Sequence, residues 1–302
     1  MLNERCLICD SRKTKFWFQK KSHDDQKLYD IRRCFVCNSA YVEPPPTEEY
    51  LHDFYNLEKN SLCGAISQDN THEYLATIQQ QERDYPNSTI DAHRIALFSR
   101  KFANGKKFLD VGAGYGFFTK AACDAGFVCT AIEVGKNNCQ VFKLLTGLIP
   151  INHPFDDEFA NTHEQSFDVV LLSQVLEHMP NPKVVVDRIF KVLKDEGLCV
   201  IAVPHFGSFI SKLQGQRDMF MVPPGHINFF SSKGLKNLFE NKGFSTIKLH
   251  TLSRFDPQKL EKRIKPKVVS VATTNILNTI LKISDLLNRG MFINAYFRKS
   301  GS

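Results

Sequence analysis

The sequence predicts an α/β protein built on a doubly wound parallel sheet, with a small zinc-binding module ahead of it. Three observations lead to this prediction. Short apolar runs alternate with helix-like segments from residue 106 onward, the first run ends in a glycine-rich loop at 112–116, and two Cys-x-x-Cys pairs lie near the start of the chain. Alternating strands and helices form parallel sheets with helices on both faces. Ligands of such sheets bind beyond the carboxyl ends of the strands.

The N-terminal module carries two Cys-x-x-Cys pairs, which together supply Cys6, Cys9, Cys34 and Cys37. Each pair forms a turn that directs two thiolates at one point, and two such turns complete a tetrahedral Zn²⁺ site. Between the pairs, Thr14–Gln19 and Leu28–Arg33 alternate apolar with polar residues, as a two-stranded ribbon does. Redox-active thiols are the alternative, but a redox pair usually opens a helix within a βαβ unit. We therefore predict a zinc-ribbon-like module over residues 1–45, with a structural metal.

Residues 46–105 are predicted to form a linker and N-terminal helices. The three prolines of Glu43–Thr47 exclude the interior of a strand or helix. Ser88–Asp91 resembles a capping box, which begins a helix that ends near Phe102. The remaining residues, 106–302, are expected to form the main domain.

The main domain is expected to alternate strands with helices. The predicted strands are Lys107–Val111, Phe127–Ile132, Leu148–Asn152, Phe167–Ser173 and Leu198–Val203. The predicted helices are Phe117–Ala125, Asn137–Leu145 and a helix from Pro182 to Lys194, in which Asn181 is the N-cap and the proline takes the first helical position.

Residues 255–290 are expected to form a helical insertion before the last strand, because apolar residues from Val269 to Leu287 recur at helical spacing. A helix that packs over the core, or that forms the face of a homodimer, is the simpler interpretation. A lid over the substrate is the alternative, with the basic stretch Lys259–Lys267 in contact with phosphate. The sequence leaves the oligomeric state open.

The glycine-rich loop does not have the spacing of a phosphate-binding loop. A dinucleotide fingerprint needs a glycine at position 117, which is Phe117, and the Gly-Lys-Ser/Thr of a Walker loop is absent. Asp110 lies two residues before the first glycine, where its charge repels a pyrophosphate and attracts an ammonium or a sulfonium. Glu133 lies about twenty residues after the first glycine, where its carboxylate can accept hydrogen bonds from both hydroxyls of a ribose. Together these features predict S-adenosylmethionine (SAM) as the cofactor.

Three longer motifs resemble class I SAM-dependent methyltransferases of the small-molecule and sugar methyltransferase group. Phe108–Gly116 is similar to motif I of that family, and Phe167–Pro182 is similar to its FDvvxxxxVLEHxpNP block. His226–Ser231, with Leu235 and Gly243-Phe244 after it, resembles the trailing motif of the group. The resemblance covers roughly residues 90–250 and implies a Rossmann-like, seven-stranded methyltransferase sheet. It also implies an antiparallel pair of strands at the sheet edge, at Ser245–Leu249 and Met291–Phe297.

The resemblance implies a set of cofactor contacts. The side chain of Asp110 and the backbone of the loop hold the methionine end of SAM, Glu133 binds the ribose, Asp156 recognises the adenine, and two residues at the end of the fourth strand line the methionine side. The loop residues are Gly112, Ala113, Gly114 and Gly116, and the residues at the strand end are Ser173 and Gln174.

Methyl transfer is an in-line displacement in which positioning supplies much of the catalysis. An oxygen or nitrogen acceptor of high pKa also needs a base within hydrogen-bond reach. His205, His226 and His178 are the candidates: His205 follows the fifth strand, His226 lies in a Pro-Pro-Gly loop, and His178 often has a structural role in this family. Some quinone methyltransferases of the group bind a metal through Glu-x-x-Glu-His. Gln174 replaces the first glutamate here, so no catalytic metal is predicted.

Composition restricts the function further. The 302 residues carry a net charge of +7, lack the N-terminal pattern of a signal peptide and contain no apolar run long enough to span a membrane. Nine cysteines without a secretory signal are typical of a reduced, cytoplasmic protein. The predicted function is methyl transfer to a small-molecule acceptor, namely a sugar, a sugar nucleotide or a surface glycan.

Two alternatives remain from the sequence. An RNA methyltransferase would use the zinc ribbon to grip RNA, although the Asn/Asp-Pro-Pro-aromatic motif of base amine methylation is absent after the fourth strand. A non-catalytic binding protein would keep only the cofactor fold. The intact acids and glycines of the loop argue against that second alternative.

Overall fold

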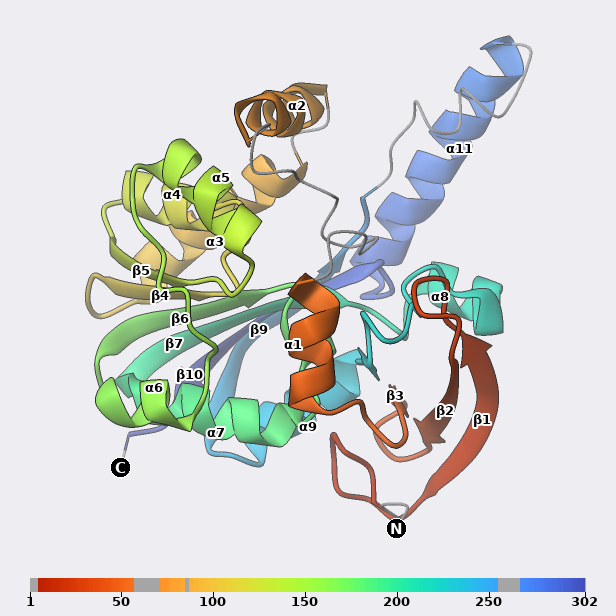
Figure 1. Cartoon of the computed structure of the whole chain (residues 1–302). Coiled ribbons are helices and arrows are strands. Elements are labelled where there is room, and N and C mark those ends of the chain that lie inside the picture. Colours follow the sequence, from red (N-terminus) through yellow and green to blue (C-terminus); the bar gives the residue numbers. More distant parts are fainter. Residues whose placement is uncertain (1–4, 57–70, 85–86, 255–266, 302) are drawn as a thin grey trace.

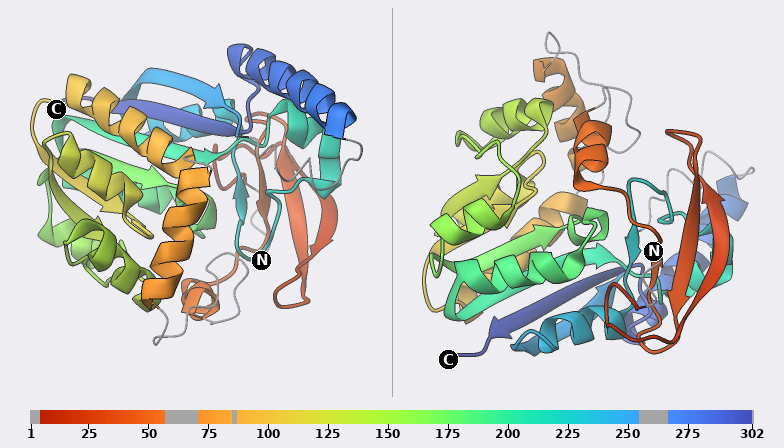
Figure 2. Two further views of the ribbon diagram at one scale, coloured as in Figure 1. Left: turned by 90° about the horizontal axis from the view of Figure 1, so that it is seen from above. Right: turned by 60° about the horizontal axis from the view of Figure 1, so that its bottom comes forward.

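The structure, a computed structural model, describes residues 5–56, 71–84, 87–254 and 267–301. A central sheet has helices on both faces, and a second, smaller sheet built from the N-terminal strands stands beside it (Figures 1 and 2). Within the described ranges, no helix has both the length and the apolar character that crossing a bilayer requires.

The central sheet confirms the predicted α/β class. Its strands lie in the order β5-β4-β6-β7-β10-β9. The bounds are β4 Lys107–Val111, β5 Val128–Ile132, β6 Phe167–Ser173, β7 Leu193–Pro204, β9 Phe244–Leu252 and β10 Phe292–Lys299. The first four are mutually parallel, whereas β10 is antiparallel to both β7 and β9. The carboxyl ends of β4, β5, β6 and β7 therefore meet at one edge of the sheet.

The sheet has six strands, and the seventh strand expected at Leu148–Asn152 is a single parallel bridge between Ile132 and Ile151. Ile151 donates to Ala131 and accepts from Glu133 through backbone atoms. Pro150 lacks an N–H, and Ile149 is 78% exposed, so neither residue supports a longer ladder.

The helices divide between the two faces of the central sheet (Figure 1). One face carries α3 Asn87–Phe102, α4 Phe117–Asp124 and α5 Lys136–Thr146, and the other carries α6 Asp157–Thr162, α7 Pro182–Val192 and α9 Ser232–Glu240. The predicted start of α7 is confirmed, because the Asn181 side chain accepts from the backbone N–H of Val184 and Pro182 is the first helical residue. The helix ends at Val192, since β7 begins at the next residue.

The smaller sheet has the order β1-β2-β3-β8 and is entirely antiparallel. Its strands are β1 Thr14–Lys21, β2 Leu28–Cys34, β3 Ala40–Val42 and β8 Asn228–Phe229. The β1–β2 ribbon matches the prediction, whereas β8 comes from within the main domain. Cys34, Cys37 and Tyr41 also belong to the same buried cluster as Phe230 and Leu235. The N-terminal module thus shares both a sheet and a core with the main fold, and its boundary at residue 45 stays a prediction.

In the described parts of the chain, four further helices lie outside these layers: α1 Glu48–Asn56, α2 Thr71–Asp84, α8 Phe209–Gln214 and α11 Lys267–Leu286. The expected helical insertion contains α11, whereas the basic stretch Lys259–Lys267 lies outside the described residues except for its last member. Among the described side chains of α11, Leu281 and Ser284 are buried, and Ile276 and Leu286 are 62% and 82% exposed. One side of its C-terminal half therefore packs on the fold. The lid and the dimer face stay predictions.

Candidate active site

The three glycines of the loop between β4 and α4 share a left-handed backbone and differ in the space around them. Gly112, Gly114 and Gly116 all have positive φ, at 68°, 54° and 91°. A Cβ on Gly112 would lie 2.6 Å from a methyl group of Val175, and one on Gly116 would lie 2.8 Å from the ring of Phe142. A Cβ on Gly114 would meet no described atom within 4 Å. The loop is therefore packed tightly at its two ends and open at its centre.

The Glu133 carboxylate binds this loop. Glu133 follows directly after β5 and is only 6% exposed. Its Oε2 accepts from the Gly114 N–H at 2.7 Å, and its Oε1 accepts from Gly135 N at 2.8 Å and from Asn138 Nδ2 at 3.2 Å. One side chain thus links the β4–α4 loop to the start of α5. Since each carboxylate oxygen can accept two hydrogen bonds, Oε2 keeps capacity for a ligand hydroxyl.

Asp110 lies at the carboxyl end of β4 and is 1% exposed. Its Oδ2 accepts from the Thr119 hydroxyl at 2.6 Å. Burial raises the pKa of Asp110 to about 7, the Thr119 hydrogen bond acts in the opposite direction, and the charge of Glu133 adds to the rise. The carboxyl group is therefore close to half-protonated at neutral pH, and a cation beside it would favour its ionised form.

Ser173 is the last residue of β6, the strand next to β4, and Gln174 follows it, so both lie at the end of this strand as the sequence predicts. Gln174 has a positive φ of 58°. Its backbone N–H and its side-chain Nε2 both donate to the carbonyl oxygen of Ala202 in β7, at 2.7 and 3.2 Å. The amide of Gln174 thus fastens β6 to its neighbouring strand.

Asp156 is the N-cap of α6. Its Oδ1 accepts from the backbone N–H of Phe159 at 2.9 Å, and its Oδ2 lies 3.8 Å from Nδ1 of His153. The side chain is about one-third exposed. Asp156 therefore has a structural role as a cap, and its predicted role in adenine recognition stays a proposal.

His205 follows β7 directly, at the same sheet edge as the glycine-rich loop, and it is 3% exposed. Its Nδ1 lies 2.9 Å from the carbonyl oxygen of Gly290, and its Nε2 lies 3.1 Å from the Ser232 hydroxyl. Because a carbonyl only accepts, Nδ1 carries the hydrogen and the lone pair of Nε2 accepts from Ser232. Burial, with smaller contributions from Arg289 and Lys212, lowers the pKa of His205 to about 4. The imidazole is therefore neutral at physiological pH.

His178 and His226 lie together in a separate cluster with Glu177. The two imidazole rings are 4.8 Å apart, and Nε2 of His178 lies 4.0 Å from the Glu177 carboxylate. Burial lowers the pKa of both histidines, to about 3 for His178, and raises the pKa of Glu177 to about 8. Both nitrogens of His178 face backbone carbonyls, of Gly225 and of Gln174. The structure thus separates His205 from the other two candidate bases.

A cavity of about 590 Å³ lies where the smaller sheet meets the carboxyl edge of the central sheet. The sequence did not reveal it, because its walls come from distant segments: β1 and β2, the residues after β7, α8, the start of α9 and the end of α11. The described lining residues are Trp17, Arg33, Asn38, His205, Phe206, Gly207, Ser211, Lys212, Gly215, Ser231, Ser232, Lys233, Leu287, Asn288 and Arg289. His205 is the one predicted base among them.

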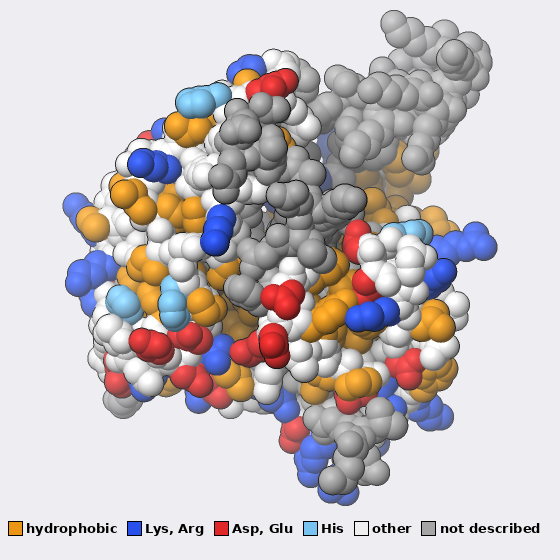
Figure 3. All heavy atoms as spheres, viewed as in Figure 1, with side chains coloured by type: hydrophobic (Ala, Val, Ile, Leu, Met, Phe, Trp, Pro, Cys, Tyr) orange, Lys and Arg blue, Asp and Glu red, His pale blue; other side chains and the backbone are white. Residues whose placement is uncertain are grey.

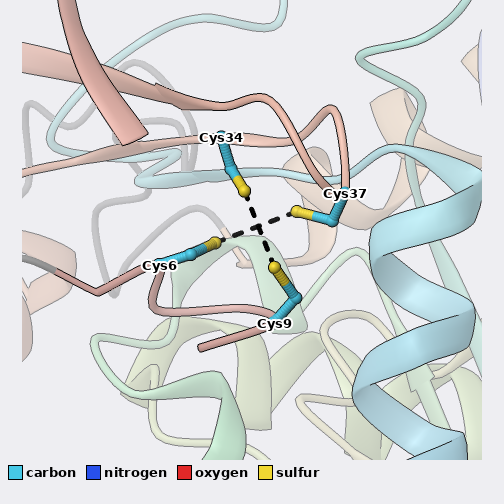
Figure 4. Close-up of side chains that lie close together, drawn as sticks. All are labelled: Cys6, Cys9, Cys34 and Cys37. Atoms are coloured by element: carbon cyan, nitrogen blue, oxygen red, sulfur yellow. Dashed lines mark hydrogen bonds between the residues drawn. The ribbon is translucent and has the colours of Figure 1, made fainter. Parts of the chain in front are cut away.

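The four predicted zinc ligands converge at the base of the smaller sheet. Figure 4 shows their sulfur atoms directed at one point between the two Cys-x-x-Cys turns. Sγ of Cys6 lies 3.8 Å from that of Cys37, and Sγ of Cys9 lies 3.6 Å from that of Cys34. A tetrahedral site with Zn–S bonds of about 2.3 Å has S–S edges of about 3.8 Å. The spacing and the all-thiol donor set fit Zn²⁺.

A family model described as a methyltransferase domain matches residues 80–249, more than half of the chain. The chain belongs to this methyltransferase family. The match includes the glycine-rich loop, Glu133 and all three candidate bases, and it excludes the N-terminal cysteines and α11.

Among curated relatives, the methyltransferase is similar to ubiquinone biosynthesis O-methyltransferases. It is 36% identical to that of Psychrobacter arcticus over 104 residues, which are 32% of this chain and 40% of the relative. It is 30% identical to that of Vibrio atlanticus over 148 residues, which are 45% of this chain and 62% of the relative. The chain thus spans less than two thirds of the length of these relatives.

Among solved structures, the methyltransferase resembles a SAM-dependent methyltransferase from Archaeoglobus fulgidus. The TM-score is 0.52 at 17% identity, over 74% of this chain and 99% of the other. This likeness shows the fold alone, and it confirms the predicted methyltransferase sheet.

We predict that Gly112→Ala destabilises the protein more than Gly114→Ala does. Both changes place a side chain at positive φ, which costs about 1–2 kcal/mol. Only the change at Gly112 also drives a Cβ into Val175, and such overpacking costs about 1–3 kcal/mol more. The free energy of unfolding from urea titration measures the difference. Equal losses in the two variants would contradict the packing we describe around the loop.

Proposed function

We propose that the protein transfers a methyl group from SAM to a small-molecule acceptor, and that the acceptor is a sugar, a sugar nucleotide or a surface glycan. The observation that carries this proposal is the pair of buried carboxylates, Asp110 and Glu133, on either side of an open glycine-rich loop. Two acids at this corner repel phosphate and suit a ligand that combines cationic groups with ribose hydroxyls.

The residues present fit SAM. Asp110 and the loop of Gly112, Ala113, Gly114 and Gly116 would hold its methionine end, with Ser173 and Gln174 nearby, and Asp156 would lie towards its adenine. Oε2 of Glu133 has a free acceptor position for a ribose hydroxyl, and the space above Gly114 leaves room for a ligand against the backbone. The bound cofactor supplies an electrophilic methyl group on a sulfonium.

We propose that His205, rather than His178 or His226, accepts the proton of the acceptor. His205 is neutral, has a lone pair on Nε2 and lines the cavity. Gly207 keeps this nitrogen accessible, because a Cβ on Gly207 would lie 2.7 Å from it. Since His205 is buried and Ser232 is less so, the Ser232 hydroxyl relays the proton: it takes the hydrogen of the acceptor hydroxyl as it gives its own to Nε2.

Two observations bear on the class of acceptor: the names of the relatives and the charge of the visible surface. The relatives are named as O-methyltransferases, which supports an oxygen acceptor on a small molecule. On the visible part of the face in Figure 3, basic and acidic side chains are interspersed, without the continuous basic stripe that a nucleic acid would favour.

Incubation with SAM labelled in its methyl group and a panel of acceptors tests the proposal. The panel contains sugar nucleotides, a reduced quinone and an RNA transcript. We expect label to enter the sugar nucleotides. Labelled RNA or quinone in their place would contradict the acceptor class, while loss of SAM binding would contradict the whole proposal.

We also propose a structural Zn²⁺ on Cys6, Cys9, Cys34 and Cys37. The four thiols take all positions of a tetrahedral metal, so the ion has no open position for chemistry. Because such a site needs reduced thiols, it suits a protein that works in the cytoplasm.

We predict that SAM binds more tightly as the pH rises through about 7. The pKa of Asp110 is raised to about 7 in the free protein, and a cation binds better to the ionised carboxylate. The dissociation constant for SAM, measured by calorimetry between pH 5.5 and 8.5, should therefore fall with rising pH.

Asp110→Asn is the matched variant, since it keeps the shape of the side chain and removes its charge. We expect it to bind SAM at least about tenfold more weakly and to lose the pH dependence around 7. Binding of SAM by this variant with unchanged affinity and pH profile would contradict the role of Asp110.

We predict that His205→Gln lowers the rate of methyl transfer to the labelled acceptor by about a hundredfold or more, the usual contribution of a general base. The affinity for SAM should not change, because His205 lies outside the loop. Gly207→Ala should lower the rate as well, since its methyl group would crowd Nε2. His93→Gln, on the exposed surface of α3, is the control and should keep full activity.

We predict one equivalent of zinc per chain by elemental analysis. Cys9→Ser should reduce the zinc content and lower the free energy of unfolding, because the ion stabilises the fold that holds it. Cys139→Ser, at a partly buried cysteine in α5, is the control and should retain the metal. A protein that is fully folded and free of metal would overturn this proposal.

A further inference from the structure

We propose that the cavity beside the smaller sheet binds the phosphate groups of a small phosphorylated acceptor. The inference rests on the proposed function, because it assigns a chemical class to the molecule that receives the methyl group. Four cationic side chains line the cavity, and none of its described lining residues is acidic: the cations are Arg33, Lys212, Lys233 and Arg289.

These four cations lack acidic partners in the part of the chain that the structure describes. None of them takes part in an ion pair there. Arg289 donates only a long hydrogen bond, of 3.4 Å, to the carbonyl oxygen of Gly207. Nε of Arg33 is buried without a hydrogen-bond partner. Since an unpaired buried donor costs free energy, a ligand that supplies acceptors to it gains affinity.

Aromatic rings hold the Arg33 guanidinium in place. Its central carbon lies 5.7 Å from the ring of Trp17 and 5.9 Å from the ring of Phe206, and the two rings pack edge to face at 5.6 Å. Contact with ring faces leaves the N–H groups at the edge of the guanidinium for another acceptor. This planar fork matches two oxygens of a phosphate group.

The charge and the size of the cavity favour a diphosphate over a single carboxylate. Four cations exceed what one negative charge balances, whereas a diphosphate carries several charges on adjacent groups. A volume of about 590 Å³ also leaves space beyond the phosphates for the rest of a small molecule. Arg33 and Arg289 lie outside the residues that match the methyltransferase family, whereas Lys212 and Lys233 lie within them, so the cavity combines both parts of the chain.

The cavity places this anion site next to the proposed base. His205 and Ser232 line the same space as the four cations, so a phosphate held there brings the remainder of the acceptor towards Nε2. The anion also has an electrostatic effect on His205. Arg289 and Lys212 contribute to the low pKa of His205, and a bound phosphate screens their charges and makes Nε2 a stronger base.

Calorimetry with inorganic pyrophosphate, uridine diphosphate and a short single-stranded RNA tests the inference. Arg33→Gln should weaken pyrophosphate and uridine diphosphate binding by about tenfold or more, as expected for a lost charge-assisted contact. The double variant Lys212→Ala, Lys233→Ala changes two exposed side chains that the fold does not need, so it tests the site even if Arg33→Gln folds poorly. Lys106→Ala, just before β4 and so at the opposite edge of the central sheet, is the control.

Tighter binding of uridine diphosphate than of pyrophosphate would show that the cavity also takes a nucleoside, and equal binding would show that it reads the phosphates alone; either result supports the site. No pyrophosphate binding, or equal weakening by Lys106→Ala, would overturn it. RNA binding that depends on Arg33, with no uridine diphosphate binding, would overturn the small-molecule acceptor.

SAM affinity is measured in the same variants and should be unchanged. Failure of SAM to bind the wild-type protein would count against the proposed function and leave the anion site standing.

Discussion

The organisation of the candidate active site depends on one carboxylate. Glu133 accepts hydrogen bonds from Gly114 and Gly135, so it joins the loop after β4 to the start of α5. Two backbone segments that follow neighbouring parallel strands are thereby held at a fixed separation, with the buried carboxyl of Asp110 beside them. Asp110 at the end of β4 and Glu133 after β5 place acidic side chains at this corner of the sheet. The cavity at the other end of the same edge is lined by cationic side chains, so its environment is chemically opposite. With the ligands that we propose, the fold keeps a cationic and an anionic ligand in separate places.

Short-range patterns in the sequence predicted the central fold well. The strand β4, the α7 start at Asn181 and Pro182, and the antiparallel β9 and β10 follow from patterns within a few residues or from motifs that match a family. The expected strand at Leu148–Asn152 reduces to one bridge, because strand propensity in that segment does not account for the missing donor of Pro150 or for the exposure of Ile149.

The features that the sequence did not reveal depend on contacts between distant segments. β8 pairs with β3 across nearly two hundred residues, and no local pattern in a two-residue strand indicates its partner. The cavity likewise unites Trp17 and Arg33 with Arg289, so its charge could not be read from any single stretch. Sequence reasoning proposed three histidines as bases, and only the folded chain separates His205, in the cavity, from the pair beside Glu177.

The contact between the cysteine site and α9 has a consequence for the cell. The Ser231 hydroxyl donates to the carbonyl oxygen of Cys37 and caps the helix on which Ser232 meets His205. With the metal we propose, the geometry of the proton acceptor therefore depends on an ion that takes no part in the reaction. A molecule that lacked this zinc would therefore turn over slowly even where it still bound its cofactor.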